Sequence, residues 1–221
     1  MRGIIKKSYS FIINAVKAWD KRTNYAALRW LRKITNTNSK KFYDDLLARK
    51  GKQWRSFPYE TLLEFLPTDK PFTLLDIGCA LGDGCIFLKE KFPDSDFSGA
   101  DWSSVGIATA KEKSKEINFF ELNILKNSPP KNYDYISMLS TLEHFDHPYE
   151  VIEKCLKFVN KALFIYSPYT KSFDDPHLYG SGLHRFLFNE DTFAGYDSEV
   201  LKITQLVEAT GYQYILYRIN P

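Results

Sequence analysis

Short apolar runs alternate with helical segments through the middle of the chain, a spacing that few folds accommodate. The apolar runs predict strands at Thr73–Ile77, Asp96–Ala100, Ile117–Glu121, Tyr133–Leu139 and Ala162–Ser167. The segments between them predict helices at Cys85–Lys91, Val105–Lys115 and Pro148–Phe158. Repeated strand–helix units of this length indicate a mostly parallel sheet with helices on its faces. We therefore expect an α/β fold.

The carboxyl-terminal part departs from this alternation. Residues Ser198–Thr210 read as a helix that ends before Gly211, and Tyr212–Ile219 reads as a last strand. This leaves one clear strand after Ser167. We expect a Rossmann-like, twisted sheet of fewer than seven strands, whose last hairpin lacks a partner or takes it from Arg185–Phe188.

Charge divides the chain into two parts. Residues 1–55 contain 15 Lys and Arg against 3 Asp and Glu, whereas residues 56–221 contain 15 against 24. The first part reads as helices, one of them basic and amphipathic, so we expect a basic helical N-terminal cap over residues 1–57 and a main domain over 58–221. Such a helix suits a structural cap or an anionic membrane surface. Because no recognisable RNA-binding module accompanies it, a nucleic-acid partner is not expected.

Composition favours an intracellular protein. The sequence lacks a run of about 18 apolar residues, which argues against a membrane-spanning helix. Its three cysteines, Cys79, Cys85 and Cys155, show no metal-ligand spacing, and their odd count does not suit a disulfide framework. We expect a cytoplasmic location, or a peripheral one at the inner face of the membrane.

The most informative stretch follows the first predicted strand and reads Leu-Leu-Asp-Ile-Gly-Cys-Ala-Leu-Gly-Asp-Gly over residues 74–84. Small residues at Gly78, Ala80 and Gly82 let the backbone turn sharply and approach a ligand closely. In open α/β sheets, ligands bind beyond the carboxyl ends of the strands, where this turn lies. A nicotinamide dinucleotide would require Gly-x-Gly-x-x-Gly, and here the third small residue comes one place early.

Three further landmarks follow strand ends. Asp101 ends the second strand, where a carboxylate can accept hydrogen bonds from ribose hydroxyls, and Trp102 beside it could pack on an adenine. Asn123 follows the third strand, and Leu-Glu-His-Phe-Asp-His-Pro follows the fourth over residues 142–148. All of them fall at one rim of the expected sheet.

Over about residues 70–168, this order of landmarks resembles the class I S-adenosylmethionine-dependent methyltransferases. The turn after the first strand is similar to their hydrophobic-Asp-x-Gly-x-Gly-x-Gly motif, with Ala80 at the middle glycine position. The run over 142–148 is similar to one common in small-molecule methyltransferases. The resemblance implies an S-adenosylmethionine-binding domain that uses S-adenosyl-L-methionine as cofactor.

The resemblance also implies roles for individual residues. Asp76 and the glycine loop would hold the methionine part of the cofactor, with Gly78 giving backbone access to it. Asp101 would bind the ribose. Asn123 would contact the adenine amino group through its side-chain oxygen, at a position where the family usually has Asp.

Three histidines are candidates for the site that binds the methyl acceptor. His144, His184 and His177 all follow the fourth or fifth strand, and an imidazole is a suitable base for a hydroxyl acceptor. His144 is the first candidate because the Glu-His pair of the resembled family borders the cofactor. The alternative for His144 is a packing or helix-capping role. A metal role for Asp174, Asp175 and His177 has no recognisable ligand motif behind it, so no metal is expected.

The segment Tyr166–Leu187 has the composition of a binding loop, with aromatic, Asp, His and Arg side chains. This set suits a sugar or a phenolic ring. We expect methyl transfer to a small-molecule, saccharide or glycolipid acceptor, on a hydroxyl oxygen. The alternatives are a quinone or lipid methyltransferase at the membrane surface and a non-catalytic, cofactor-binding regulatory domain.

Overall fold

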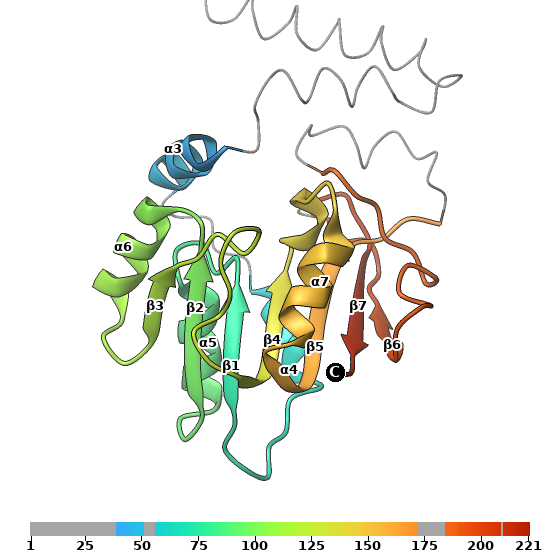
Figure 1. The fold of residues 1–221 in the computed structure, drawn as a ribbon, viewed down its shortest axis with the longest axis horizontal. Helices are drawn as coiled ribbons and strands as arrows, with labels where there is room; N and C mark the ends of the chain where they lie inside the picture. Colours follow the sequence, from blue (N-terminus) through green and yellow to red (C-terminus); the bar gives the residue numbers. More distant parts are fainter. Residues whose placement is uncertain (1–38, 51–55, 172–183, 209) are drawn as a thin grey trace, which may run out of the picture.

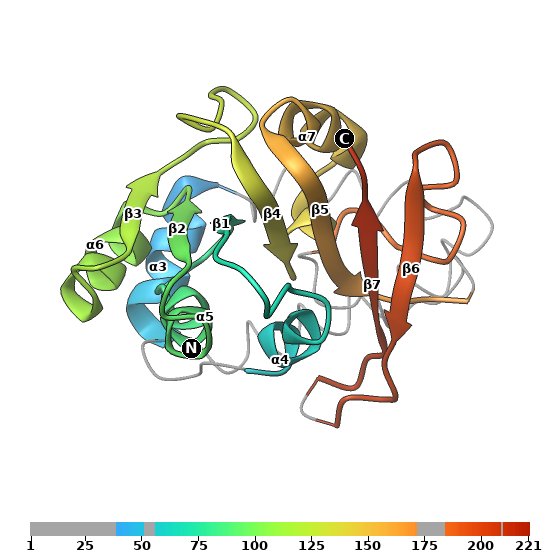
Figure 2. The same ribbon diagram turned by 90° about the horizontal axis from the view of Figure 1, so that it is seen from below.

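A computed structural model of the chain describes residues 39–50, 56–171, 184–208 and 210–221. Its centre is one sheet of seven strands in the order β3-β2-β1-β4-β5-β7-β6 (Figures 1 and 2). The strands are β1 Thr73–Ile77, β2 Asp96–Asp101, β3 Asn118–Glu121, β4 Tyr133–Leu139, β5 Val159–Pro168, β6 Ser198–Ile203 and β7 Tyr214–Ile219. The first five run parallel, whereas β7 is antiparallel to both β5 and β6. The predicted Rossmann-like α/β sheet is confirmed.

Helices cover both faces of the sheet (Figure 2). They are α3 Lys40–Lys50, α4 Phe57–Leu63, α5 Asp83–Lys91, α6 Ser104–Lys113, the 3₁₀ turn η1 Leu142–His144 and α7 Pro148–Leu156. Side chains of α4, α5 and α6 share one apolar core with the sheet, and those of α7 share the other. Because β1 to β5 are parallel, their carboxyl ends meet at one rim, the upper one in Figure 1.

The predicted strand count was wrong, because residues 198–203 form the edge strand β6 and not a helix. β6 completes an ordinary carboxyl-terminal hairpin with β7, so Arg185–Phe188 does not supply a strand of the sheet. A register shift between Val200 and Lys202 interrupts the pairing. The shift breaks the period-2 alternation that would have indicated a strand. Helical expectations over 5–19 and 25–34 lie outside the described residues.

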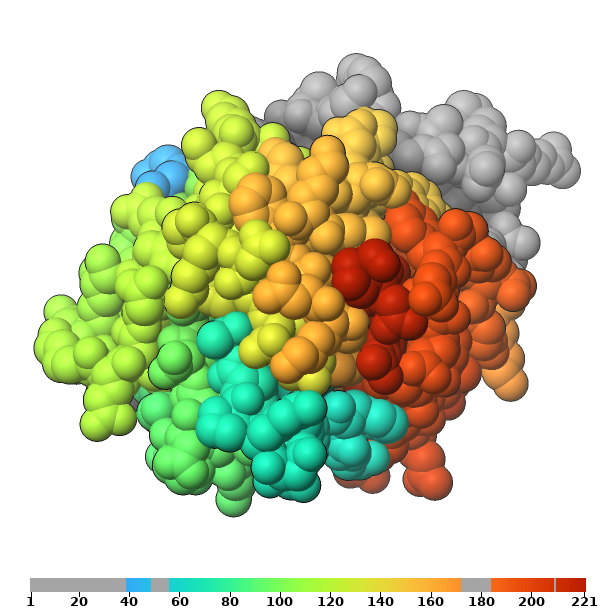
Figure 3. All heavy atoms as spheres, turned by 60° about the horizontal axis from the view of Figure 1, so that its bottom comes forward, coloured from blue at the N-terminus to red at the C-terminus, as the bar shows by residue number. Residues whose placement is uncertain are grey.

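Side chains of helix α4 contact both the first strand and the carboxyl-terminal hairpin. The Phe57 ring packs on Tyr166 and Tyr214, with centroids 6.2 and 5.4 Å away. At Gly84 an added Cβ would lie 1.8 Å from the Tyr59 ring, so only glycine lets α4 and α5 come this close. The space-filling view shows the α4 segment, in cyan, lying against the red carboxyl-terminal strand (Figure 3). In the described part of the chain, no helix is long and apolar enough to cross a bilayer.

Candidate active site

The turn after β1 takes up left-handed backbone at three residues. Gly78, Ala80 and Gly82 have φ angles of 88°, 50° and 78°. The Gly78 N–H donates to the Ala100 carbonyl at 2.7 Å, which ties the turn to the end of β2. A Cβ at Gly78 would lie 2.2 Å from Thr141 Oγ1, so glycine is required there twice over, by φ and by space. The turn is therefore held at the end of β2, with Thr141 of the loop after β4 beside it.

Asp101 holds this turn from the neighbouring strand. Its Oδ2 accepts from the Ala80 N–H at 2.9 Å, and its Oδ1 accepts from the Ser103 N–H at 2.7 Å. Burial raises the pKa of Asp101, and the nearby Asp44 carboxylate raises it further, against the backbone hydrogen bonds that lower it. Ser103 caps α6 by accepting from the Gly106 N–H, so Asp101 does not serve as the helix cap. Trp102 lies half-buried between Asp101 and Ser103.

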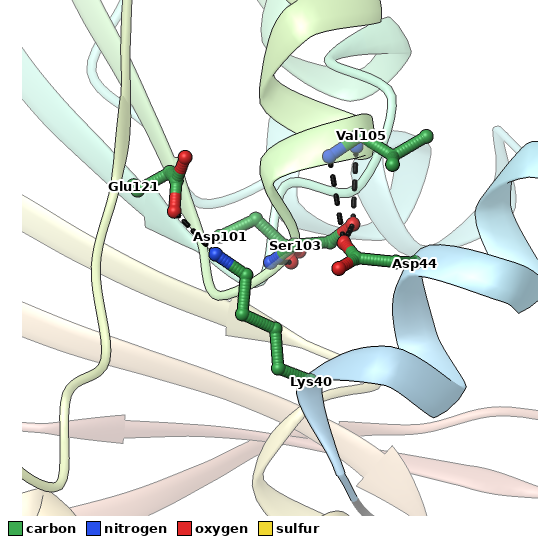
Figure 4. A network of polar contacts seen from close by, with 7 residues as sticks. Lys40, Asp44, Asp101, Ser103, Val105 and Glu121 are labelled. Atoms are coloured by element: carbon green, nitrogen blue, oxygen red, sulfur yellow. Dashed lines mark hydrogen bonds and ion pairs between the residues drawn. The ribbon is translucent and has the colours of Figure 1, made fainter.

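Helix α3, which belongs to the expected N-terminal helical cap, is docked over the same rim. The Asp44 carboxylate accepts from the Ser103 hydroxyl and from the Val105 N–H (Figure 4). Lys40 forms an ion pair with Glu121 at 2.6 Å. Both partners of that pair are more than a third exposed, so it orients the helix more than it stabilises the fold. Figure 1 shows α3 above the carboxyl ends of β2 and β3.

Tyr43 points from α3 toward the loop after β4. Its ring lies 6.1 Å from that of His144, centroid to centroid. Burial raises the pKa of the Tyr43 phenol, the Glu143 and Asp101 carboxylates raise it further, and the Arg185 guanidinium opposes them. The phenol therefore lies among charged groups that come from three separate parts of the chain. A local sequence pattern cannot indicate contacts between residues so far apart in the chain. The sequence therefore did not single out Tyr43.

Two of the three predicted catalytic histidines come together. The rings of His144 and His184 lie 5.6 Å apart, and His184 is 9% exposed. Glu143 brings them together, because its carbonyl accepts from the N–H groups of Arg185 and Phe186 at 2.6 and 3.2 Å. His177, together with the acidic pair Asp174 and Asp175, lies outside the described residues.

The Glu143 side chain is buried beneath this pair. It accepts from the Ser167 hydroxyl at 3.1 Å. Burial raises the pKa of its carboxyl, and the neighbouring His144 opposes that rise. Glu143 thus orients the loop through its carbonyl and supports His144 through its charge.

Asp76 lies below the turn, inside the protein. Its carboxylate is 1% exposed and accepts from the hydroxyls of Ser137 at 2.7 Å and Tyr59 at 2.8 Å. Burial raises the pKa of Asp76 to about 6, although both hydrogen bonds lower it. The visible function of Asp76 is to tie α4 and β4 to β1, and its predicted role at the methionine part of the cofactor stays a prediction.

Asn123 stands at the end of β3, as predicted. Its Oδ1 accepts from the Leu125 N–H at 3.1 Å, so the side chain closes a local turn. The Leu122 N–H donates to the Asp101 carbonyl at 2.9 Å, which keeps this turn beside the end of β2. The adenine contact of Asn123 stays a prediction.

The rim has the chemistry that S-adenosyl-L-methionine requires. The buried Asp101 carboxylate has its pKa raised, so a ligand that donates hydrogen bonds or brings positive charge would bind favourably. The cofactor brings both, because it carries ribose hydroxyls and a sulfonium. Its backbone would find the left-handed turn at Gly78 to Gly82 beside that carboxylate.

Comparison with known proteins identifies the family. A family model described as a methyltransferase domain matches residues 26–216. Since the match covers most of the chain, the protein belongs to this methyltransferase family. It is a class I, S-adenosylmethionine-dependent methyltransferase, and S-adenosyl-L-methionine is its cofactor.

Individual relatives are more distant. Trans-aconitate 2-methyltransferase of Rhodopseudomonas palustris (strain BisB18) is 33% identical over 82 residues, which is 37% of this chain and 32% of that protein. The chain thus matches about a third of that relative's length. The YcgJ protein from Bacillus subtilis has a TM-score of 0.63 at 9% identity, over 75% of this chain and 99% of that one. The plantazolicin methyltransferase BpumL, in complex with a triazolic desmethylPZN analog and SAH, has a TM-score of 0.55 at 17% identity, over 97% of both chains.

Replacing Tyr59 with Phe tests the buried carboxylate below the turn. The hydrogen bond from Tyr59 lowers the pKa of Asp76, whose value of about 6 lies above the ordinary 3.8. Ionising Asp76 therefore costs stability as pH rises through about 6, and Tyr59 offsets part of that cost. We expect Tyr59→Phe to lose about 1.5–3 kcal/mol at pH 8 and about 1 kcal/mol at pH 5 in urea unfolding.

The matched control is Tyr149→Phe, because the Tyr149 hydroxyl donates to the Thr192 carbonyl and no carboxylate is involved. Its loss should be the same at both pH values. An equally pH-independent loss in Tyr59→Phe would show that Asp76 does not ionise in this range.

Proposed function

We propose that this protein transfers the methyl group of S-adenosyl-L-methionine to a hydroxyl oxygen of a small-molecule acceptor. The observation that carries the proposal is the pair of imidazoles, His144 and His184, beside Tyr43 at the rim of the sheet. His144 comes from η1, His184 from the connection between β5 and β6, and Tyr43 from α3. The acceptor would lie beside this cluster.

The cofactor would lie across the ends of β1 and β2. Asp101 would accept hydrogen bonds from the ribose hydroxyls with the lone pairs that Ala80 and Ser103 leave available. The turn from Gly78 to Gly82 would hold the methionine part, with Trp102 and Asn123 at the adenine. Docked α3 would cover this arrangement and exclude water from it.

The chemistry needs alignment and one proton transfer. When bound, the cofactor supplies an electrophilic methyl carbon on a sulfonium. A lone pair of the acceptor oxygen forms the new bond to that carbon as the carbon–sulfur bond breaks, and the sulfur leaves as a neutral thioether. His144 takes the hydroxyl proton, which an imidazole can do near neutral pH. Holding the reactants in line supplies much of the remaining gain in rate.

The composition of the segment between β5 and β6 supports a saccharide or glycolipid as the finer acceptor class. Aromatic faces and hydroxyl partners are what sugar recognition uses. Tyr212, from the connection between β6 and β7, adds an aromatic ring 5.8 Å from that of His184. Residues 172–183 of the expected binding loop lie outside the described part.

A carboxylate acceptor is the second candidate. It is supported by the relatives named trans-aconitate 2-methyltransferase. A carboxylate is ionised at neutral pH and already carries the attacking lone pair, so its methylation needs no base. The two candidates therefore differ in how far they depend on His144.

The basic arm over residues 1–35 is proposed to bring the enzyme to an anionic membrane surface, from a cytoplasmic location. Its positive charge supports this role, as it supports the alternative of a quinone or lipid acceptor at the membrane. The boundary of the cap at residue 57 remains part of this proposal. The non-enzymatic alternative, a regulatory domain that binds the cofactor without transfer, predicts no turnover with any acceptor.

Replacing Asp101 with Ala tests the placement of the cofactor. Isothermal titration of the natural chain should give micromolar binding of S-adenosyl-L-methionine, about −8 kcal/mol. The variant should lose about 1.5–3 kcal/mol of that, the range for hydrogen bonds to a charged group. Asp134→Ala is the matched control, because Asp134 also accepts from backbone at Thr73 but is held by Lys161 at the opposite end of the sheet. Binding of NADH without binding of S-adenosyl-L-methionine would contradict the placement.

Replacing His144 with Ala tests the base. Release of S-adenosylhomocysteine with a hydroxyl acceptor should fall by about 10²–10⁴-fold, with cofactor affinity little altered. His147→Ala, an exposed histidine three residues further on, should keep the natural rate. If the turnover rate of His144→Ala stays within tenfold of that of the natural chain, the assignment of His144 as the base is wrong. A carboxylate acceptor is then favoured.

Deleting residues 1–35 tests the arm. Sedimentation with anionic phospholipid vesicles should be lost on deletion, while cofactor affinity stays nearly unchanged because α3 begins at Lys40. In the natural chain, binding should weaken steeply as salt rises, since charge contacts are screened over about 8 Å at physiological ionic strength. Vesicle binding that does not respond to salt, or no binding at all, would leave the arm as a structural cap.

A further inference from the structure

Arg185 brings a buried positive charge to the rim. Its side chain is 9% exposed, and its buried Nε has no hydrogen-bond partner among the residues that the structure describes. Among the described residues its guanidinium has one ion pair, from Nη1 to Asp146 Oδ1 at 3.4 Å. The Asp146 side chain is 61% exposed, so it shares its charge with solvent. A buried charge is costly unless it is paired and hydrogen-bonded, so this guanidinium has capacity for an anion.

Arg185 lies at the proposed acceptor site, so an anion bound to its guanidinium would lie there too. The Arg185 N–H donates to the Glu143 carbonyl at 2.6 Å, which fixes the residue against η1. His184, its neighbour in the chain, has its ring 5.6 Å from the proposed base His144. The guanidinium also lowers the pKa of the Tyr43 phenol, against burial and two carboxylates that raise it, so its charge reaches the space under α3.

The geometry of arginine narrows the ligand to an oxyanion. A guanidinium presents its N–H groups as a planar fork, and two parallel hydrogen bonds to the two oxygens of a carboxylate are its preferred pairing. Asp146 engages the Nη1 end at 3.4 Å, and within the described part of the chain the Nε edge has no partner. A carboxylate placed on that edge would satisfy the buried N–H and neutralise the charge together.

We propose that Arg185 binds a carboxylate group of the methyl acceptor, so that the acceptor is a small organic acid. The inference rests on the proposed function, because it assigns a ligand to the same acceptor site. Arg185 would be a specificity-determining residue that positions the acceptor, whichever of its oxygens receives the methyl.

The test uses the full-length protein saturated with S-adenosylhomocysteine. Trans-aconitate, succinate and benzoate are titrated calorimetrically, each against its uncharged amide, and then offered as substrates with S-adenosyl-L-methionine. We expect at least one acid to bind and its amide not to bind. Arg185→Gln should weaken that binding about 100-fold, and Arg185→Lys less, because an ammonium keeps the charge without the fork. In turnover, KM for the acid should rise while kcat changes little.

Arg218→Gln is the matched control. Among the described residues Arg218 Nε is also buried without a partner, but Arg218 lies on β7 in an ion pair with Glu199. It should leave acid binding unchanged. Unaltered affinity for S-adenosylhomocysteine in Arg185→Gln and Arg185→Lys shows that these variants fold.

The outcomes separate the inference from the proposed function. If no acid binds, or if methyl phosphate binds through Arg185 in place of the acids, the carboxylate assignment is overturned. If uncharged hydroxyl acceptors are methylated equally by the natural chain and Arg185→Gln, the inference fails and the proposed function stands. If acids bind through Arg185 but no acceptor is ever methylated, Arg185 is a carboxylate-binding residue, but the proposed function fails and the bound acid is not a methyl acceptor.

Discussion

The Asp101 carboxylate connects the parts of this molecule that have to meet. It accepts one N–H from the turn after β1 and one from the start of the segment that becomes α6. Its neighbour Ser103 donates to Asp44, so α3 is fixed over the same strand ends. A parallel sheet brings its carboxyl ends to one rim by geometry alone, and Asp101 sets the turn, the helix and the covering helix at fixed positions on that rim.

Burial raises the pKa of three carboxyl groups in this arrangement. Asp76, Asp101 and Glu143 are all held in places where ionisation is costly, each with its pKa raised by burial. Asp76 has protein hydroxyls as partners and serves the fold. Asp101 faces the rim, where hydroxyls and a sulfonium would improve its surroundings, and Glu143 supports a histidine. The cost of burying a carboxylate thus serves the fold at Asp76, and in the proposed site it favours a ligand at Asp101 and supports His144 at Glu143.

Much of the fold could be predicted from local pattern. The five parallel strands and the helices between them followed from apolar runs and their spacing, because period and length are local properties of the chain. Strand β6 could not be found in this way. Its bulge between Val200 and Lys202 removes the alternation, and its pairing with β7 is decided by the sheet and not by the segment itself.

The site shows the same division. The small residues of the turn and the acid at the end of β2 stand in local patterns with a known chemical use, so they could be named from the sequence. Tyr43 and Asp44 have no such pattern. Their relevance comes from contacts across about 60 to 100 residues of chain, Asp44 with Ser103 and Tyr43 with His144, and only the fold brings them to the rim. Arg185 was expected only as one member of the binding loop Tyr166–Leu187.

The central claim is that the cofactor lies over the ends of β1 and β2, beneath α3, with its methyl group directed at His144. A crystal structure of the protein with S-adenosylhomocysteine tests it most directly. We predict ribose hydroxyls within hydrogen-bonding distance of Asp101, and the sulfur on the side of Tyr43 and His144. A ligand bound elsewhere on the sheet, or one whose sulfur faces away from His144, would contradict this account.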